Sequence, residues 1–177
     1  MLHRWGTPTQ LGYVIADLDE AMGHWIRTLG VGPFFVFDVG VDDYRLRGQT
    51  QAGPIGATIA LANVGSLQIE LIEPHGDGPS LWHEFLAANP AGGLQHLSWW
   101  PDDYGAAVAD AAAAGWRVGH DGVIGGGRFA YYDMAPPGHP GTVIEIAEMI
   151  PSRRHLFEVV RKAAEGWDGS TDPIRPR

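Results

Sequence analysis

The chain has 177 residues, of which 45% are hydrophobic, 21 are acidic and 12 are lysine or arginine, so its formal net charge is −9. This composition supplies enough apolar side chains for one folded domain and excludes collagen-like, low-complexity and globally disordered chains. Nucleic acid and anionic membranes are unfavourable partners for such a charge, and the absence of cysteine excludes disulfides and zinc–cysteine sites. The sequence shows no signal peptide and no apolar stretch of about 18 residues, so we expect a cytoplasmic protein without a membrane span.

The first part of the chain predicts one strand, one helix and then three more strands. Asp17 or Asp19 can cap a helix that runs to about Leu29, where Gly30 ends it. Glycines separate the apolar segments that follow. The expected strands of this part are 10–16, 34–37, 56–62 and 67–72.

A linker then contains a predicted helix, residues 80–89, which Ser80 can cap. After the linker the order of strand, helix and three strands repeats, with a helix that Asp103 leads and Gly115 ends. The expected segments of this part are strand 95–100, helix 104–114 and strands near 116–119, 128–133 and 141–148.

Short segments also recur in the same order in the two parts. Residues 69–73, Ile-Glu-Leu-Ile-Glu, are similar to residues 144–148, Ile-Glu-Ile-Ala-Glu, and residues 10–14 align with residues 96–100. Two ordered matches at both ends of a segment indicate an internal repeat. The sequence therefore predicts two copies of one βαβββ module.

The two modules, about 8–73 and 94–149, are expected to form a single α+β domain over residues 1–151. Residues 152–177 are expected to add a helix, which Ser152 can cap, and a frayed tail. Apolar residues recur at helical spacing in that helix. This stripe either packs on its own domain or covers a second subunit.

Strand alternation places four polar side chains on the inner face of the expected sheet. In the last strand of each module the uniformly apolar face should meet the helices, which leaves Glu70 and Glu145 on the other face. The same alternation in the first strands assigns Gln10 and His96 to that face. An isolated carboxylate inside a sheet cavity costs roughly several kcal/mol. A cation would neutralise two of them.

The repeat with these four residues resembles the vicinal oxygen chelate superfamily, which includes glyoxalase I, methylmalonyl-CoA epimerase, extradiol dioxygenases and bleomycin-type resistance proteins. The resemblance spans residues 8–149 and is closest to the epimerase and its glyoxalase I-like relatives. The segments that carry it are 70–74, 80–89, 92–97 and 144–146. It implies a cupped mixed β-sheet around one divalent metal ion, held by Gln10, Glu70, His96 and Glu145.

Three oxygens and one imidazole are ligands that suit Zn, Ni, Co, Mn or Mg. Each residue also has a purely structural interpretation. Gln10 can be an ordinary polar residue that opens a strand, and His96 can be a hydrogen-bonded core histidine. Glu70 and Glu145 can face water on an open sheet.

The resemblance implies an isomerase or lyase that shifts a proton next to a metal-chelated carbonyl. A divalent ion acidifies that proton, and a carboxylate beside the ion can remove it. Glu145 is the implied base, and Glu70 is the second candidate catalytic carboxylate. The epimerase also needs a carboxylate on the opposite face, for which Asp42 or Asp43 is the candidate here.

The residues expected around the substrate are mostly apolar, which favours a partly apolar carbonyl compound or acyl thioester. An arginine near the rim could hold an anionic group, although solvated arginines are commoner. Superfamily members usually dimerise, so the resemblance also implies a homodimer. The candidate substrate-binding residues are Val14, Phe35, Trp100, Tyr131 and Arg128.

Two other functions compete with this interpretation. A metal-free binding or resistance protein would normally lack the carboxylates. An extradiol dioxygenase needs two histidines and one carboxylate around Fe(II), and Gln10 stands at one of the required histidine positions.

Overall fold

A computed structural model describes residues 5–51, 54–133 and 143–176. Its first part contains β1 (Gln10–Val14), α1 (Leu18–Leu29), β2 (Phe34–Gly40), β3 (Asp42–Leu46), β4 (Gln49–Thr50), β5 (Gly56–Val64) and β6 (Leu67–His75). Its second part contains α2 (Leu81–Ala88), β7 (Gly93–Trp99), α3 (Tyr104–Ala113), β8 (Val118–Ile124), β9 (Gly127–Asp133), β10 (Val143–Ala147), α4 (Pro151–Ala164) and β11 (Ile174–Pro176).

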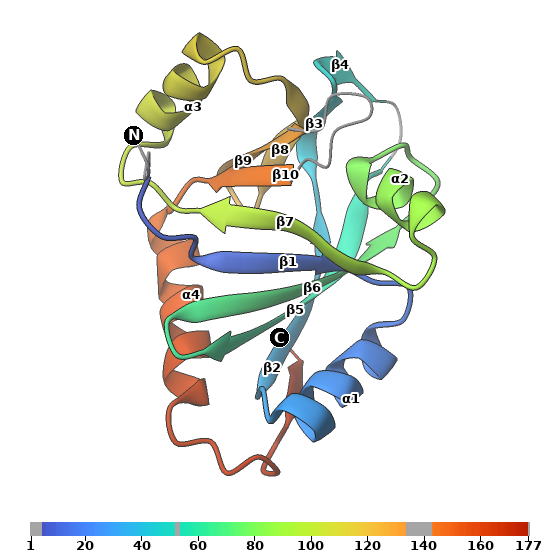
Figure 1. The fold of residues 1–177 in the computed structure, drawn as a ribbon, viewed down its shortest axis with the longest axis vertical. Coiled ribbons are helices and arrows are strands. Elements are labelled where there is room, and N and C mark those ends of the chain that lie inside the picture. The colour runs from blue at the N-terminus through green and yellow to red at the C-terminus, as the bar shows by residue number, and fades with distance from the viewer. Residues whose placement is uncertain (1–4, 52–53, 134–142, 177) are drawn as a thin grey trace.

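The strands of the described residues form one curved, mixed, eleven-stranded sheet (Figure 1). Its order is β11-β2-β5-β6-β1-β7-β10-β9-β8-β3-β4. The two modules contribute β2-β5-β6-β1 and β7-β10-β9-β8 in mirrored order, so the first strand of each, β1 and β7, meet at the centre as antiparallel neighbours. This arrangement confirms the predicted α+β fold of two βαβββ modules.

Helices α1 and α3 cover the outer face of the sheet, as the alternation of the strands requires. Residues of α1 pack with Ile69 and Leu71 of β6, and residues of α3 pack with Ile146 of β10. Because neighbouring side chains along a strand point to opposite faces, Glu70 and Glu145 then belong to the inner face.

Local signals set the helix ends where the sequence predicts them. The side chain of Asp17 accepts a hydrogen bond from the backbone N–H of Glu20, and Gly30 ends α1 in the left-handed conformation with a φ of 66°. Asp103 caps α3 in the same way, through the N–H of Ala106.

Both outer edges of the sheet differ from the expectation. The expected frayed tail is wrong for β11, which pairs in parallel with β2 because that strand otherwise ends the sheet with unpaired backbone groups. At the other edge, the hairpin of β3 and β4 leaves the first module and pairs with β8 of the second. Strand β8 also runs over Val118–Ile124, beyond the expected 116–119.

Helix α4 packs on its own chain. It begins at Pro151 after Ile150 and has no side-chain cap, so the expected cap by Ser152 is wrong; proline suits the first turn because its missing N–H would have no partner there. Val160 is completely buried, and Leu156 packs against the same core. The apolar stripe is thus used within the domain, and the homodimer remains a prediction.

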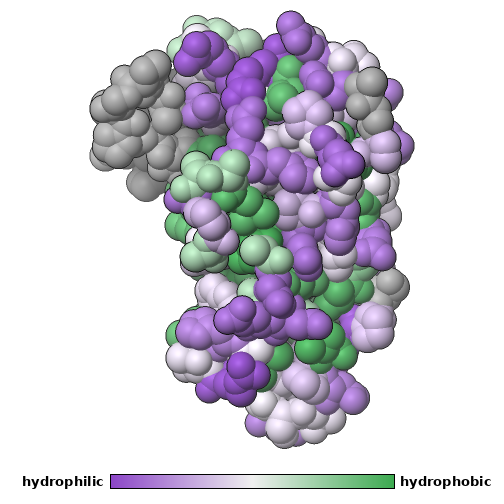
Figure 2. Space-filling model, turned by 90° about the vertical axis from the view of Figure 1, so that its right-hand side faces the viewer, coloured by the Kyte–Doolittle hydropathy of each residue, from purple (hydrophilic) through white to green (hydrophobic). Residues whose placement is uncertain are grey.

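The described surface is chemically mixed. Its exposed large apolar side chains, Leu29, Val64, Leu94 and Ile174, lie on four different elements. Figure 2 shows hydrophobic patches between hydrophilic residues on one face.

Among the described helices, none is long and apolar enough to cross a membrane. The first two residues of the expected strand 141–148 lie outside the described residues.

Candidate metal centre

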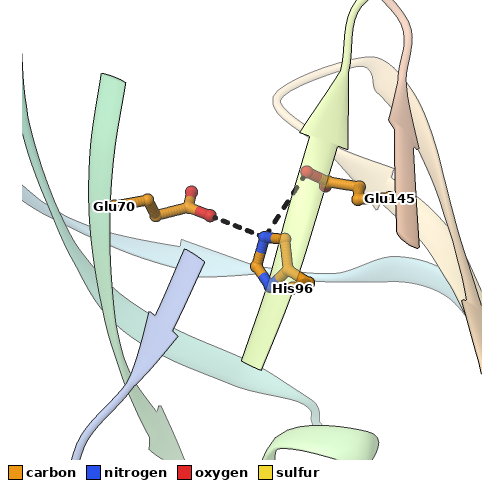
Figure 3. A group of neighbouring side chains, drawn as sticks. All are labelled: Glu70, His96 and Glu145. Atoms are coloured by element: carbon orange, nitrogen blue, oxygen red, sulfur yellow. Dashed lines mark ion pairs between the residues drawn. The ribbon is translucent and has the colours of Figure 1, made fainter. Parts of the chain in front are cut away.

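Three predicted ligands lie together on the inner face near the junction of the modules. Glu70 comes from β6, His96 from β7 and Glu145 from β10, and their ligand atoms lie within 4.8 Å of one another (Figure 3). The Nε2 atom of His96 is 3.5 Å from an oxygen of Glu70 and 3.6 Å from an oxygen of Glu145. All three residues are buried. The sheet thus gathers one imidazole and two carboxylates from strands far apart in sequence.

A glycine in β1 makes this gathering possible. Gly12 pairs with Glu70 on one side and with His96 on the other, so β1 runs between the two ligands. A Cβ atom at Gly12 would overlap the imidazole of His96. The ring therefore lies across β1 only because this position has no side chain.

The orientation of His96 directs one ring nitrogen to the carboxylates. Its Nδ1 atom lies 2.7 Å from the side-chain oxygen of Gln95, and a carboxamide oxygen accepts hydrogen bonds. Nδ1–H therefore donates to Gln95, and the lone pair of Nε2 faces Glu70 and Glu145. The hydroxyl of Tyr131 lies 3.4 Å from the same Nε2 atom.

Because both carboxylates are buried, it costs free energy for them to be charged side by side. Burial raises the pKa of Glu145, and the nearby Glu70 raises it further, whereas His96 and the hydroxyl of Ser98 act in the opposite direction. One oxygen of Glu145 is buried without a hydrogen-bond partner. A divalent cation would supply that partner and neutralise the charges, so the residues fit a metal ion of the class that accepts oxygen and imidazole ligands.

The fourth predicted ligand, Gln10, lies on the same face. Its amide nitrogen donates a 2.8 Å hydrogen bond to the side chain of Gln68 on the neighbouring β6, which leaves its own amide oxygen available. Gln10 lines the same cavity as Glu70 and Glu145.

That cavity has a volume of about 490 Å³, within the usual range for small-molecule sites. Its mouth lies at the exposed Gly40, Gly125 and Ser152. Most of the wall is aromatic or aliphatic. The apolar lining side chains are Phe37, Val39, Ile59, Leu61, Ile72, Trp82, Trp100, Ile124, Phe129, Tyr131, Ala147, Leu156 and Phe157.

The candidate substrate-binding residues divide into two groups. Trp100 and Tyr131 line the cavity. Val14 and Phe35 lie on the expected side of the sheet but are buried in the core, outside the described lining. Arg128 also lies outside the lining. Its guanidinium donates hydrogen bonds to Glu148 instead, and these bonds lower the pKa of that carboxyl to about 2.

The candidates for a second base lie elsewhere. Asp42 and Asp43 are exposed on β3 and outside the described lining of the cavity. The acidic residue of β2 at the rim is Asp38, which accepts a 2.6 Å hydrogen bond from Thr58. Because Phe37 and Val39 join the inner core, alternation puts the Asp38 carboxylate on the outer face.

Sequence reasoning missed a buried aromatic layer behind the site. Tyr131 stacks between His96 and His120, at ring-centre distances of 4.6 and 4.3 Å. His120 is fully buried and its Nδ1 atom lies 3.0 Å from the hydroxyl of Tyr44. No local pattern marks this histidine, since it follows from the pairing of β8 with β9 and β3.

Comparisons with known proteins agree with this architecture. The chain resembles a hypothetical protein from Bacillus halodurans, with a TM-score of 0.55 and 16% identity over 81% of this chain and 94% of that one. It resembles methylmalonyl-CoA epimerase from Mycobacterium tuberculosis, with a TM-score of 0.52 and 20% identity over 84% and 91% of the two chains. A Streptomyces coelicolor methylmalonyl-CoA epimerase variant, solved with 2-nitronate-propionyl-CoA, gives a TM-score of 0.52 and 19% identity over 82% and 95%.

At these identities the solved structures establish the fold alone. No curated protein sequence matches the chain significantly. A family model matches residues 9–132, which include Gln10, Glu70 and His96. The chain therefore belongs to the Glyoxalase/Bleomycin resistance protein/Dioxygenase superfamily.

Proposed function

We propose that this protein binds one divalent metal ion through Gln10, Glu70, His96 and Glu145 and shifts a proton next to a chelated carbonyl, as an isomerase or lyase. The observation that carries this proposal is the buried group of two carboxylates and one imidazole on the wall of an apolar cavity. A partly apolar carbonyl compound fits that wall.

Each residue has a distinct part in this reaction. When bound, the metal ion would act as a Lewis acid that holds two adjacent substrate oxygens and acidifies the neighbouring C–H. Glu145 would take the proton, since one of its oxygens has no hydrogen-bond partner. Glu70 lies on the other side of His96 and would return the proton or remain a ligand. The apolar wall would exclude water while the proton is held.

A metal-free binding protein is the second candidate, and the cavity itself favours it. An apolar space of about 490 Å³ can bind a small molecule without chemistry. Two buried carboxylates side by side argue for the enzyme, because they cost free energy in a site that only binds apolar compounds.

Metal analysis combined with proton exchange tests the proposal. Protein stripped with EDTA and reloaded with Mn²⁺, Co²⁺, Ni²⁺ or Zn²⁺ should retain one ion per chain after gel filtration. The loaded protein should then exchange the α-protons of 2-oxo compounds for deuterium in D₂O, followed by NMR. Glu145→Gln should lower that exchange roughly 10²- to 10⁴-fold, the usual contribution of an acid–base group.

Glu148→Gln is the matched control, because Glu148 is a half-buried carboxylate that pairs with Arg128. It should retain both the metal ion and the exchange rate. Glu70→Gln should reduce the metal content well below one ion per chain. Retention of a full equivalent by both Glu70→Gln and His96→Ala would refute the metal site, and apolar binding without any metal uptake would favour the binding protein.

A further inference from the structure

Helix α4 contributes directly to the cavity that contains the candidate metal ligands. Leu156 and Phe157 line the same space as Glu70 and Glu145. The helix lies beyond residues 9–132, the part that the superfamily model matches, and it stands across the direction of the central strands (Figure 1). The C-terminal part of this chain therefore adds its own wall to the site.

The aromatic part of that wall is a stacked pair. The rings of Phe157 and Trp100 lie 4.7 Å apart with an angle of 36° between their planes. Trp100 directly follows β7, the strand that carries His96. The pair thus joins the helix to the strand of the metal-ligand group, and both rings face the cavity.

Helix α4 is fixed to both modules, so its side chains form a permanent wall. At its N-terminal end the guanidinium of Arg153 donates hydrogen bonds of 2.9–3.3 Å to the main-chain oxygens of the second module. The helix also packs against β5 of the first module. The oxygens that accept from Arg153 belong to Ile124, Gly127, Arg128 and Glu148.

The charges of the cavity do not suit an anionic occupant. Among the described lining residues Arg153 is the basic side chain, and its guanidinium already donates to main-chain carbonyls. The carboxylates on the inner wall belong to two of the predicted metal ligands, Glu70 and Glu145. A phosphate or carboxylate in this space would lose its hydration without gaining a cationic partner other than the metal ion.

We infer that the site takes a compact, uncharged molecule with an aromatic or branched apolar group beside two adjacent oxygens, and that Phe157 limits the size of that group. The inference rests on the proposed function for the chelating oxygens and narrows its substrate class by excluding acyl-CoA. Phe157 acts as a specificity-determining residue because it lines the apolar space from α4.

A series of neutral 1,2-diketones of increasing size tests this inference by calorimetric binding to the full-length, Mn²⁺-loaded protein. The probes are 2,3-butanedione, 1-phenyl-1,2-propanedione and benzil, with acetyl-CoA as the anionic probe. The phenyl compound should bind about tenfold or more tightly than butanedione, as burial of one ring predicts. Acetyl-CoA should bind at least tenfold more weakly than the phenyl compound.

Substitutions at Phe157 should move the size preference in opposite directions. Phe157→Ala should weaken binding of the phenyl compound about tenfold and improve binding of benzil, and Phe157→Trp should weaken both aromatic probes relative to butanedione. Phe157→Leu replaces the alanine variant if circular dichroism shows that the latter is unfolded. His155→Ala, an exposed position on the same helix, should leave every affinity unchanged.

An unchanged size ranking in the Phe157 variants overturns the inference, as does acetyl-CoA binding as tightly as the phenyl compound. Binding is measured without turnover, so failure of proton exchange leaves the size series intact. Conversely, proton exchange on an acyl-CoA with no effect of Phe157 would retain the proposed function and remove this inference.

Discussion

The two modules share a strand order but present different chemistry on the inner face. In the first module β2 and β5 turn Phe37, Ile59 and Leu61 to the cavity. In the second, β8 and β9 carry His120 and Tyr131 behind the candidate ligands. The last strand of each module nevertheless keeps one carboxylate at the equivalent position. Both modules thus supply apolar wall and candidate ligands, whereas the histidine behind the ligands, His120, belongs to the second module.

The sharpest difference lies between β1 and β7, the first strand of each module. Where the first module has Gly12, the second has Ser98 at the aligned position. Ser98 pairs with Glu145 across the sheet, and its hydroxyl lowers the pKa of that carboxyl. Gly12 instead leaves room for the ring of His96. The asymmetry lets one module accommodate the ligand that the other module provides.

Replacing Gly12 with the serine that the second module has at the aligned position should cause the largest loss of stability and of metal binding. In Gly12→Ser the new Cβ overlaps the imidazole of His96, which has no free space because it is fully buried. We expect a loss of about 3 kcal/mol in the free energy of unfolding, the upper end of the usual range for overpacked cores, and failure to bind Mn²⁺. Urea denaturation and metal analysis measure both effects.

The reverse change, Ser98→Gly, is the matched control. It removes a small side chain and adds backbone freedom in a strand, which costs about 1 kcal/mol. It should retain the metal ion. Equal losses of metal in the two variants would contradict the role of Gly12 as the space that His96 occupies.

Sequence reasoning succeeded where a strand is regular and one face is uniformly apolar. The inner positions of Glu70 and Glu145 followed from alternation alone, since each carboxylate lies between apolar neighbours of the opposite face. Alternation assigns a face but gives no depth. Val14 and Phe35 therefore lie on the expected side yet remain buried under other residues.

Contacts between distant segments were beyond the sequence signals. As an arginine, Arg128 is of a type that often binds anions. Its pairing with Glu148, however, depends on the pairing of β9 with β10. The contribution of Phe157 to the cavity depends on where α4 lies after the second module ends. Residues 174–176 carry a proline and a charge and give no strand signal, although they complete an edge.

The two outer edges offer a second test of the comparison. Strand β2 of the first module is covered by β11 from the end of the chain, whereas β8 of the second module is covered by the internal hairpin of β3 and β4. A chain that ends after Asp172 loses the backbone hydrogen bond from Phe34 to Pro173 and the pairing with β11.

We expect this truncation to lower the free energy of unfolding by about 2 kcal/mol, from a few lost hydrogen bonds at about 1 kcal/mol or less each. The exposed edge should also promote self-association, which light scattering at increasing concentration would detect. Removal of Arg177 alone is the control. A truncated chain with unchanged stability would show that β11 does not support the sheet.

The aromatic layer of the second module should make its stability depend on pH in a way that the apolar layer of the first cannot. His120 is enclosed by Tyr44, Trp82, Phe129 and Tyr131. Burial lowers its pKa well below the ordinary value of 6.5, and the neighbouring His96 and Arg47 act in the same direction. The folded protein therefore keeps this ring neutral at a pH where the unfolded chain binds a proton.

The smallest expected effect follows from this difference in proton binding. Below about pH 6.5 the unfolded state takes up a proton that folded His120 refuses, so the free energy of unfolding falls as pH falls, by at most about 1.4 kcal/mol per pH unit from this group. His120→Phe makes the layer resemble the apolar layer of the first module and removes this pH-dependent contribution to the free energy of unfolding. Urea denaturation of metal-free wild type and variant between pH 5 and pH 8 should give a stability difference that shifts in favour of the variant as the pH falls below 6.5. The comparison isolates His120 because Glu145 and the other carboxylates are common to both proteins. A difference that is constant over this range would mean that His120 is protonated equally in the folded and unfolded states.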